Sequence, residues 1–362
     1  MKPYLFAAIG ASFFATSLAV HAADVPAVLQ SKCASCHALT KPESNSLDRL
    51  WERKGPDLHY AGNKFNKEWL VEWLQDPAKI RPAGEFYRKH VKPGTKEDVV
   101  DESSLAPHPK LAREDAEAAA NALMTLTDPD GLIEKGAFKD QKVAMSMGAM
   151  YFNKLRGCAA CHSAVPGKGG LSGPEMATAG KRLQPDFIYS YIKDPQKIDK
   201  GVWMPKLDIS DADLQKLTSY IVQLSAKEDK KMNSRNSISF SWLTSIGLIS
   251  LLAFMEPAAA ASDDSFEHAE RLYDTYCTQC HGVNRDGNGV NSVFMSVQPR
   301  DHSDAKGMGD IPNSEIIDVI KKGGLAANKS VLMPAWGGVF SDEEVNQLAA
   351  YLRHVCKCGS DQ

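Results

Sequence analysis

The sequence has little net charge of either sign and few aromatic residues. Its 42 lysines and arginines nearly balance 45 aspartates and glutamates, which leaves a net charge of −3, and aromatic residues make up only 8%. Nucleic-acid-binding domains usually present a basic face, so this balance disfavours a nucleic-acid partner. Charged residues form 24% of the chain and the mean hydropathy is −0.32. These values disfavour a polytopic membrane protein and a mainly disordered chain.

The sequence also lacks the common motifs of hydrolytic and nucleotide-binding enzymes. It contains no G-x-S-x-G, no Walker A and no H-E-x-x-H pattern. These patterns would carry a nucleophilic serine, a phosphate-binding loop and a zinc site. We therefore expect no catalytic residues of this kind. Its 362 residues are enough for two or three domains.

Eight cysteines are present, and six of them form three C-x-x-C-H motifs, at residues 33–37, 158–162 and 277–281. In such a motif the two thiols form thioethers with haem, and the histidine is the proximal iron ligand. A disulfide framework or zinc-binding pairs would leave the histidine after each pair unexplained. We therefore predict three covalently bound c-type haems with their iron. The attachment residues are Cys33, Cys36, Cys158, Cys161, Cys277 and Cys280, and the iron ligands are His37, His162 and His281.

Two segments have the features of secretory signal peptides. Residues 1–22 combine Lys2, an apolar run and a small-x-small site that ends at Ala22. Residues 232–261 repeat this pattern in mid-chain, with a basic start, an apolar stretch over residues 238–255 and a run of alanines. Haem attachment to C-x-x-C-H motifs takes place on the exported side, which agrees with these signals.

The mid-chain segment has two interpretations. As a transmembrane span, residues 238–255 would place the second and third motifs on opposite sides of a membrane, although both must receive haem on the same side. We therefore expect two neighbouring gene products joined end to end, residues 1–231 and 232–362, both exported to the periplasm. A retained segment that anchors the protein to the membrane is the alternative.

Three modules of similar size remain outside these segments: residues 23–127, 128–231 and 262–362. The first two repeat each other, because residues 55–80 align with residues 173–198 at a constant offset of 118 without a gap. The apolar spacing in this stretch predicts a helix in each module that ends before a proline.

A residue that precedes a proline is the candidate sixth iron ligand in each module. These residues are Met204 in the second module and Met333 in the third. The repeat places His108 where Met204 stands, once 22 extra residues between positions 80 and 107 of the first module are allowed for. The residues that remain as alternatives are His59 and His90 for the first haem, Met176 for the second, and Met295 and Met308 for the third.

Each candidate is followed by a predicted helix, over residues 115–126, 211–224 and 342–355. Ser210 and Ser341 are the expected N-caps of the last two. Cys356 and Cys358 have no haem role, because no histidine follows them. A disulfide, a link between chains and a contact with a soft metal all remain open for this pair.

On these features, all three modules resemble class I cytochrome c domains. Each has a helix before C-x-x-C-H, an inner helix, a proline-flanked candidate ligand and a terminal helix; the first two also share Gly-Pro loops. Residues 23–231 resemble a dihaem cytochrome c, and residues 262–362 resemble a monohaem one. The resemblance implies an all-α fold, with a few helices around each haem, and electron transfer as the function.

We therefore expect a periplasmic electron carrier of a respiratory chain, working between a donor and a terminal reductase or oxidase. Bis-histidine ligation would make the first haem the low-potential centre. A dihaem cytochrome c peroxidase, which needs an open sixth position, and a cytochrome subunit of a larger oxidoreductase are the alternatives. Redox proteins are the expected partners. Residues 23–231 carry +2 and residues 262–362 carry −6, which favours docking of the two parts on each other.

Overall fold

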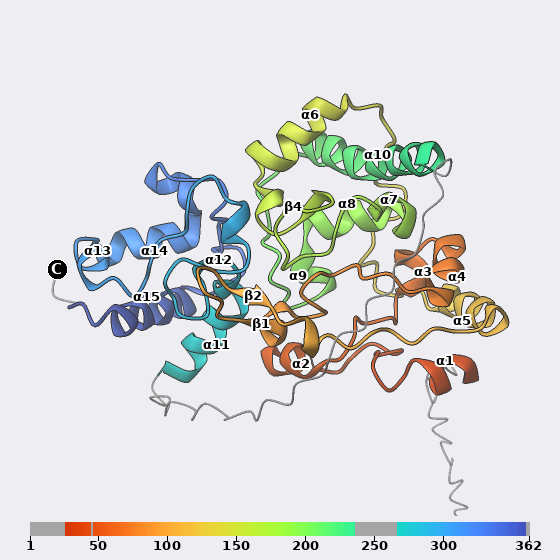
Figure 1. The fold of residues 1–362 in the computed structure, drawn as a ribbon, viewed down its shortest axis with the longest axis horizontal. Coiled ribbons are helices and arrows are strands. Elements are labelled where there is room, and N and C mark those ends of the chain that lie inside the picture. Colours follow the sequence, from red (N-terminus) through yellow and green to blue (C-terminus); the bar gives the residue numbers. More distant parts are fainter. Residues whose placement is uncertain (1–25, 45, 236–265, 360–362) are drawn as a thin grey trace, which may run out of the picture.

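The computed structural model describes residues 26–44, 46–235 and 266–359, and the fold is mainly helical (Figure 1). Residues 1–22 and 238–255, which carry the two signal-like apolar runs, lie outside these ranges. Within the described ranges, no helix is both long and apolar enough to cross a membrane. Two small antiparallel strand pairs accompany the helices, so the fold is close to the expected all-α class without being purely helical.

The first module packs its inner helix against its terminal helix. Leu70 and Leu74 of the inner helix join a core that is rich in alanines of the terminal helix, including Ala116 and Ala120. The inner helix ends at Gln75, as expected from the proline that follows. The elements of this module are α1 (Ala27–Lys32), α2 (Leu47–Glu52), α3 (Ala61–Lys64), α4 (Lys67–Gln75), η1 (Tyr87–His90), β1 (Val91–Lys92), β2 (Val99–Val100), η2 (Glu102–Ser104) and α5 (Arg113–Thr125).

The second module repeats this helix pair as α8 and α10. Its terminal helix starts at Asp211, after the expected N-cap, where the Ser210 hydroxyl accepts the Asp213 N–H at 3.2 Å. This helix continues to Arg235, beyond the predicted module boundary at residue 231. The elements are α6 (Met145–Met150), η3 (Tyr151–Leu155), η4 (Cys158–Ala160), β3 (Ser163–Val165), β4 (Lys168–Gly169), α7 (Ala179–Arg182), α8 (Pro185–Lys193), α9 (Pro195–Ile198) and α10 (Asp211–Arg235).

The last helix of the third module has a capping box at its N-terminus. The Ser341 hydroxyl accepts the Glu344 N–H, and the Glu344 carboxylate accepts the Ser341 N–H. The last residue of this helix, Cys356, forms a disulfide with Cys358, which is one of the three possibilities left open by the sequence. The elements are α11 (Glu267–Tyr276), α12 (Thr278–His281), η6 (Ser292–Phe294), α13 (Ala305–Gly309), α14 (Asn313–Lys322), η7 (Gly324–Ala327) and α15 (Asp342–Cys356).

The first two modules meet through hydrogen bonds that repeat the internal symmetry. The Asn66 N–H donates to the Arg182 carbonyl at 2.9 Å, and the Gln184 N–H donates to the Lys64 carbonyl at 2.9 Å. Asn66 and Gln184 occupy equivalent positions of the repeat, and so do Lys64 and Arg182. Each contact is therefore made twice, once in each direction, as at an interface between two copies related by a two-fold axis.

The third module shares a hydrophobic core with both other modules. Phe86 and Tyr87 of the first module, Trp203 of the second and Tyr276 of the third belong to one cluster of buried side chains. In Figure 1 the helices of the third module, drawn in cyan and blue, lie beside the hairpin β1–β2 of the first module. The parts on either side of residues 236–265 thus pack together.

Glycine at position 62 is required where α3 approaches the end of α5. The Gly62 N–H donates to the Leu126 carbonyl at 2.8 Å, and a Cβ atom at this position would lie 2.3 Å from the Met124 carbonyl oxygen. Gly62→Ala is expected to destabilise the protein by about 1–3 kcal/mol, because the two backbones must move apart. Thermal unfolding followed by circular dichroism should show a lower melting temperature. Gly359→Ala is the matched control, since nothing lies near a Cβ there, and equal melting temperatures for both variants would contradict the assigned packing.

Candidate haem sites

The histidines of the three motifs are oriented by the same type of hydrogen bond. Nδ1 lies 2.8 Å from the Pro56 carbonyl in His37, 2.8 Å from the Pro174 carbonyl in His162 and 3.0 Å from the Arg300 carbonyl in His281. A carbonyl oxygen only accepts, so Nδ1 carries the proton in each ring. The Nε2 lone pair is then available, and this is the arrangement found in histidines that bind a metal.

Glycine–proline loops hold the first two of these rings. A Cβ atom on Gly55 would lie 2.5 Å from the His37 ring, and one on Gly173 would lie 2.6 Å from the His162 ring. Only glycine leaves room for the imidazole, while the next residue, a proline, supplies the accepting carbonyl. Burial lowers the pKa of His162 to about 4, which keeps this imidazole neutral and able to bind iron at physiological pH.

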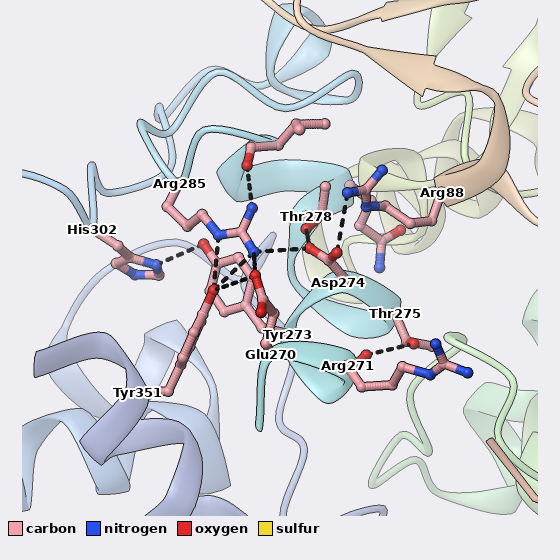
Figure 2. A network of polar contacts seen from close by, with 12 residues as sticks. Arg88, Glu270, Arg271, Tyr273, Asp274, Thr275, Thr278, Arg285, His302 and Tyr351 are labelled. Atoms are coloured by element: carbon pink, nitrogen blue, oxygen red, sulfur yellow. Dashed lines mark hydrogen bonds and ion pairs between the residues drawn. The ribbon is translucent and has the colours of Figure 1, made fainter. Parts of the chain in front are cut away.

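The third site uses a different arrangement. The His281 ring stacks on the His302 ring with 4.1 Å between the centroids. His302 Nδ1 lies 3.0 Å from the Tyr273 hydroxyl, as Figure 2 shows. His302 could not be singled out from the sequence, because it belongs to no motif and only the fold brings it to the motif histidine.

Two adjoining cavities open in front of these histidines. The larger has a volume of about 970 Å³, and both the first and the second C-x-x-C-H motifs line it. The smaller, of about 390 Å³, is lined by the third motif. Cys161, Pro205 and Leu332 line both cavities, so all three predicted haem positions are contiguous.

His108 lies across the larger cavity from His37. The two ring centroids are 6.2 Å apart, and His108 Nδ1 lies 2.9 Å from the Pro109 carbonyl, so its Nε2 is also free. Two imidazoles that bind one metal ion at about 2 Å from each nitrogen have ring centres about 6 Å apart. The spacing of His37 and His108 therefore suits a shared iron atom.

The structure separates the other candidates for the first site. His90 lines the larger cavity, where its Nδ1 lies 2.8 Å from the Ser104 hydroxyl. His59 lines neither of these cavities, and its ring packs edge-on against Tyr60. Among the described residues, His108 is thus the candidate whose ring is close to that of His37.

The candidate methionines all lie along the cavities. Met204 and Met176 line the larger cavity, and Met333, Met295 and Met308 line the smaller one. Met204 and Met333 are each followed by a proline that lines the same cavity. Loop reach and sequence context therefore remain the reasons to prefer Met204 and Met333.

The second and third motifs touch through a buried polar cluster. The Cys161 sulfur lies 3.3 Å from the side-chain oxygen of Gln279, a residue inside the third motif. The Ser172 hydroxyl donates to the same oxygen at 2.6 Å, and the Asn291 side-chain amide donates to that hydroxyl at 2.8 Å. Ser172, Gln279 and Asn291 are each at most 2% exposed. Motif spacing could not identify this cluster, because its members lie in two modules.

Two cations occupy equivalent positions of the repeat at the larger cavity. Arg182 pairs with Glu175 at 3.4 Å, whereas no ion pair within 4.0 Å holds Lys64 among the described residues. The Lys64 ammonium lies 5.0 Å from the ring centroid of Phe65, and burial lowers its pKa to about 8. A half-buried ammonium that forms no ion pair suits an anionic group in the cavity. The two propionates of a haem are such groups.

The six motif cysteines are free thiols in the structure and form no disulfide framework. Burial raises the pKa of Cys158 to about 12 and that of Cys161 to about 11. The surroundings of Cys158 and Cys161 therefore favour uncharged sulfur. A thioether provides uncharged sulfur, whereas zinc would be bound by charged thiolates. The described residues contain no group of three or more histidine, cysteine or acidic side chains that could hold a metal ion. The two cysteines and one histidine of each motif fit a covalently bound haem.

Comparisons with known proteins agree with this chemistry. The family model of cytochrome c oxidase, cbb3-type, subunit III matches residues 144–221 and 264–352, which contain the second and third motifs. A stretch of 99 residues is 28% identical to quinohemoprotein alcohol dehydrogenase ADH-IIG of Pseudomonas putida. That alignment covers 26% of this chain and 11% of the relative, so the chain spans only a small part of that protein. No solved structure matches.

The two segments matched by the family model carry a C-x-x-C-H motif each, with its histidine oriented by a carbonyl and facing an apolar cavity. Sequence similarity and local geometry point to the same cofactor, a haem bound covalently through two cysteines. Residues 144–221 and 264–352 are therefore c-type cytochrome domains.

Proposed function

We propose that this cytochrome is a periplasmic three-haem electron carrier. The observation that carries this proposal is the set of three motif histidines, all oriented through Nδ1, that face two adjoining cavities. Intact mass of the purified protein with its haem count tests it. Three haems are expected, on one chain or on two chains that begin near residues 23 and 262, and fewer than three would contradict the proposal.

Each proposed ligand has a defined task. His37 and His108 would hold the first iron, His162 with Met204 the second, and His281 with Met333 the third. When bound, a haem supplies one-electron exchange between ferric and ferrous iron. The Pro56, Pro174 and Arg300 carbonyls orient the proximal rings and make them stronger donors.

The arrangement of the motifs supports a linear path for electrons. The second motif shares the larger cavity with the first, and its Cys161 contacts Gln279 of the third motif. The second site is therefore the central one. Since bis-histidine ligation lowers the potential relative to methionine ligation, electrons would enter near His37 and leave near His281.

A role as the cytochrome subunit of a larger oxidoreductase is the second candidate. The similarity to a quinohaemoprotein dehydrogenase favours it, although the aligned part covers only 11% of that protein. Co-purification with a catalytic subunit from the native periplasm or membrane would support this role. A peroxidase has less support, because it needs an open sixth position and His108, whose ring centroid lies 6.2 Å from that of His37, would supply a sixth ligand to the first iron.

The assignment of His108 can be tested by substitution. His108→Ala is expected to convert one of the three haems from a low-spin to a high-spin state, because its iron loses the sixth ligand. Absorption and electron paramagnetic resonance spectra of the oxidised protein would show this change. His90→Ala is the matched control, since His90 lines the same cavity, and it should leave the spectra unchanged. The reverse pattern would assign His90 as the ligand.

The proposed direction depends on the order of the three potentials. A redox titration should resolve three one-electron steps, of which the lowest belongs to the first haem. His108→Met should raise the potential of that step selectively, because methionine ligation favours ferrous iron. A first haem with a potential at or above the other two would contradict the direction.

A further inference from the structure

We propose that residues 81–106 of the first module form a docking element for the third module. This element binds the chain on both sides of the third C-x-x-C-H motif, at residues 277–281. The contacts would keep residues 23–231 and 262–362 bound to each other without a covalent link. The third haem would then belong to a permanent subunit and would not be a diffusing carrier. The inference goes beyond electron transfer, because it concerns how the two parts are held together.

The second module shows that the repeated fold does not need this element. Residues 81–106 contain η1, β1, β2 and η2, and the second module has only residues 199–202 in their place. It still forms the same pair of inner and terminal helices, α8 and α10. Residues 81–106 are therefore not needed to form the helix pair of the first module, and we look for their role in contacts with other parts of the protein.

Tyr87 connects the element to the start of the third haem motif. Its side chain is 0% exposed. Its hydroxyl lies 2.9 Å from the Asp274 carbonyl and 3.0 Å from the Thr275 carbonyl, and it accepts the Gln279 N–H at 3.2 Å. One hydroxyl thus forms hydrogen bonds both at the end of α11 and at the beginning of α12. The helix α12 carries Cys280 and His281. Both of these helix ends would otherwise have buried backbone groups without partners.

Asp98 holds the chain on the other side of the same motif. Its N–H donates to the Asn288 carbonyl at 2.7 Å, and its carboxylate accepts the Val283 N–H at 2.7 Å. The Asp98 side chain is buried, and this burial raises its pKa. The element therefore contacts the third module both before and after residues 280–281.

Apolar packing accompanies these hydrogen bonds. Phe86 is 1% exposed, and its ring lies 5.0 Å from that of Trp51 and 5.2 Å from that of Trp203. The Trp51 indole N–H in turn donates to the Thr275 hydroxyl of the third module at 2.9 Å. These rings pack in one core with Tyr273 and Tyr276 of the third module. Separation of the two parts would therefore expose this core, and a shared apolar core is typical of a lasting interface.

Two ion pairs cross the interface, and the first module supplies the cation in one pair and the anion in the other. Arg88 pairs with Asp274 of the third module at 3.0 Å, as Figure 2 shows. Arg271 of the third module pairs with Asp48 of the first at 2.6 Å, with the charges reversed. We therefore expect the association to depend only weakly on salt, although the two parts carry +2 and −6 overall.

The test cuts the full haem-loaded protein at a specific protease site placed between residues 236 and 265. Size-exclusion chromatography at low micromolar concentration follows, in physiological and in high salt. A single peak that contains both fragments and all haem is expected in both buffers. Separate peaks from the cut wild-type protein would overturn the proposal. Haem count and potentials are measured on the uncut protein, so their failure would affect the proposed function alone.

Two conservative substitutions examine the element itself. Tyr87→Phe and Asp98→Asn should each weaken the association of the cut fragments about tenfold. The first leaves the buried Gln279 N–H without its acceptor, and the second replaces the charged acceptor of the Val283 N–H with a neutral amide and buries an additional NH2 group. Tyr151→Phe and Asp186→Asn are matched controls. Within the second module, the Tyr151 hydroxyl bonds Asp213 at 2.9 Å, and the Asp186 carboxylate accepts the Gly136 N–H at 2.7 Å.

The controls should leave the association unchanged while all four variants keep the absorption spectrum of the wild type. Equal weakening by the controls would show a general loss of stability and would overturn the assignment to residues 81–106. No weakening by Tyr87→Phe and Asp98→Asn would overturn it as well.

Discussion

A hydrogen bond from each motif histidine to a backbone carbonyl orients the imidazole rings at all three sites. A C-x-x-C-H sequence can hold a haem by its sulfurs, but the iron needs an imidazole in one tautomer and one orientation. The carbonyls of Pro56 and Pro174 set both for the first two sites. Glycines 55 and 173 are required because the rings lie where a Cβ would be. Each ring lines one of the two cavities with its Nε2 free.

The way in which the modules join determines how the sites can communicate. Reciprocal hydrogen bonds through Asn66 and Gln184 bring the first two modules together around one cavity. The third module is attached differently, through a shared aromatic core and through contacts to its own haem motif. Both kinds of contact bring the sites to adjoining positions. In modules of about 100 residues, which bury limited apolar surface by themselves, these contacts also add to the common core.

Much of the fold could be read from periodicity and end signals. The inner helix α4, the terminal helix α15 and the capping residue Ser341 lie where the pattern placed them, because helix boundaries depend on nearby residues. The end of α10 differs, since this helix continues to Arg235 past the expected boundary. Local pattern also missed the hairpin β1–β2 and the burial of Tyr87. The buried Tyr87 contacts residues almost two hundred positions away, and no short window of sequence contains both.

The sequence specifies the haem chemistry locally, because two cysteines and a histidine at fixed spacing are a local covalent requirement. It also pointed to His108, through a repeat that can be aligned position by position. The folded molecule brings the ring of His108 to 6.2 Å from that of His37 and Cys161 into contact with Gln279. It also places residues 81–106 against the third module. Such contacts depend on how whole modules pack, and packing between distant segments is a property of the folded surface that spacing along the chain does not encode.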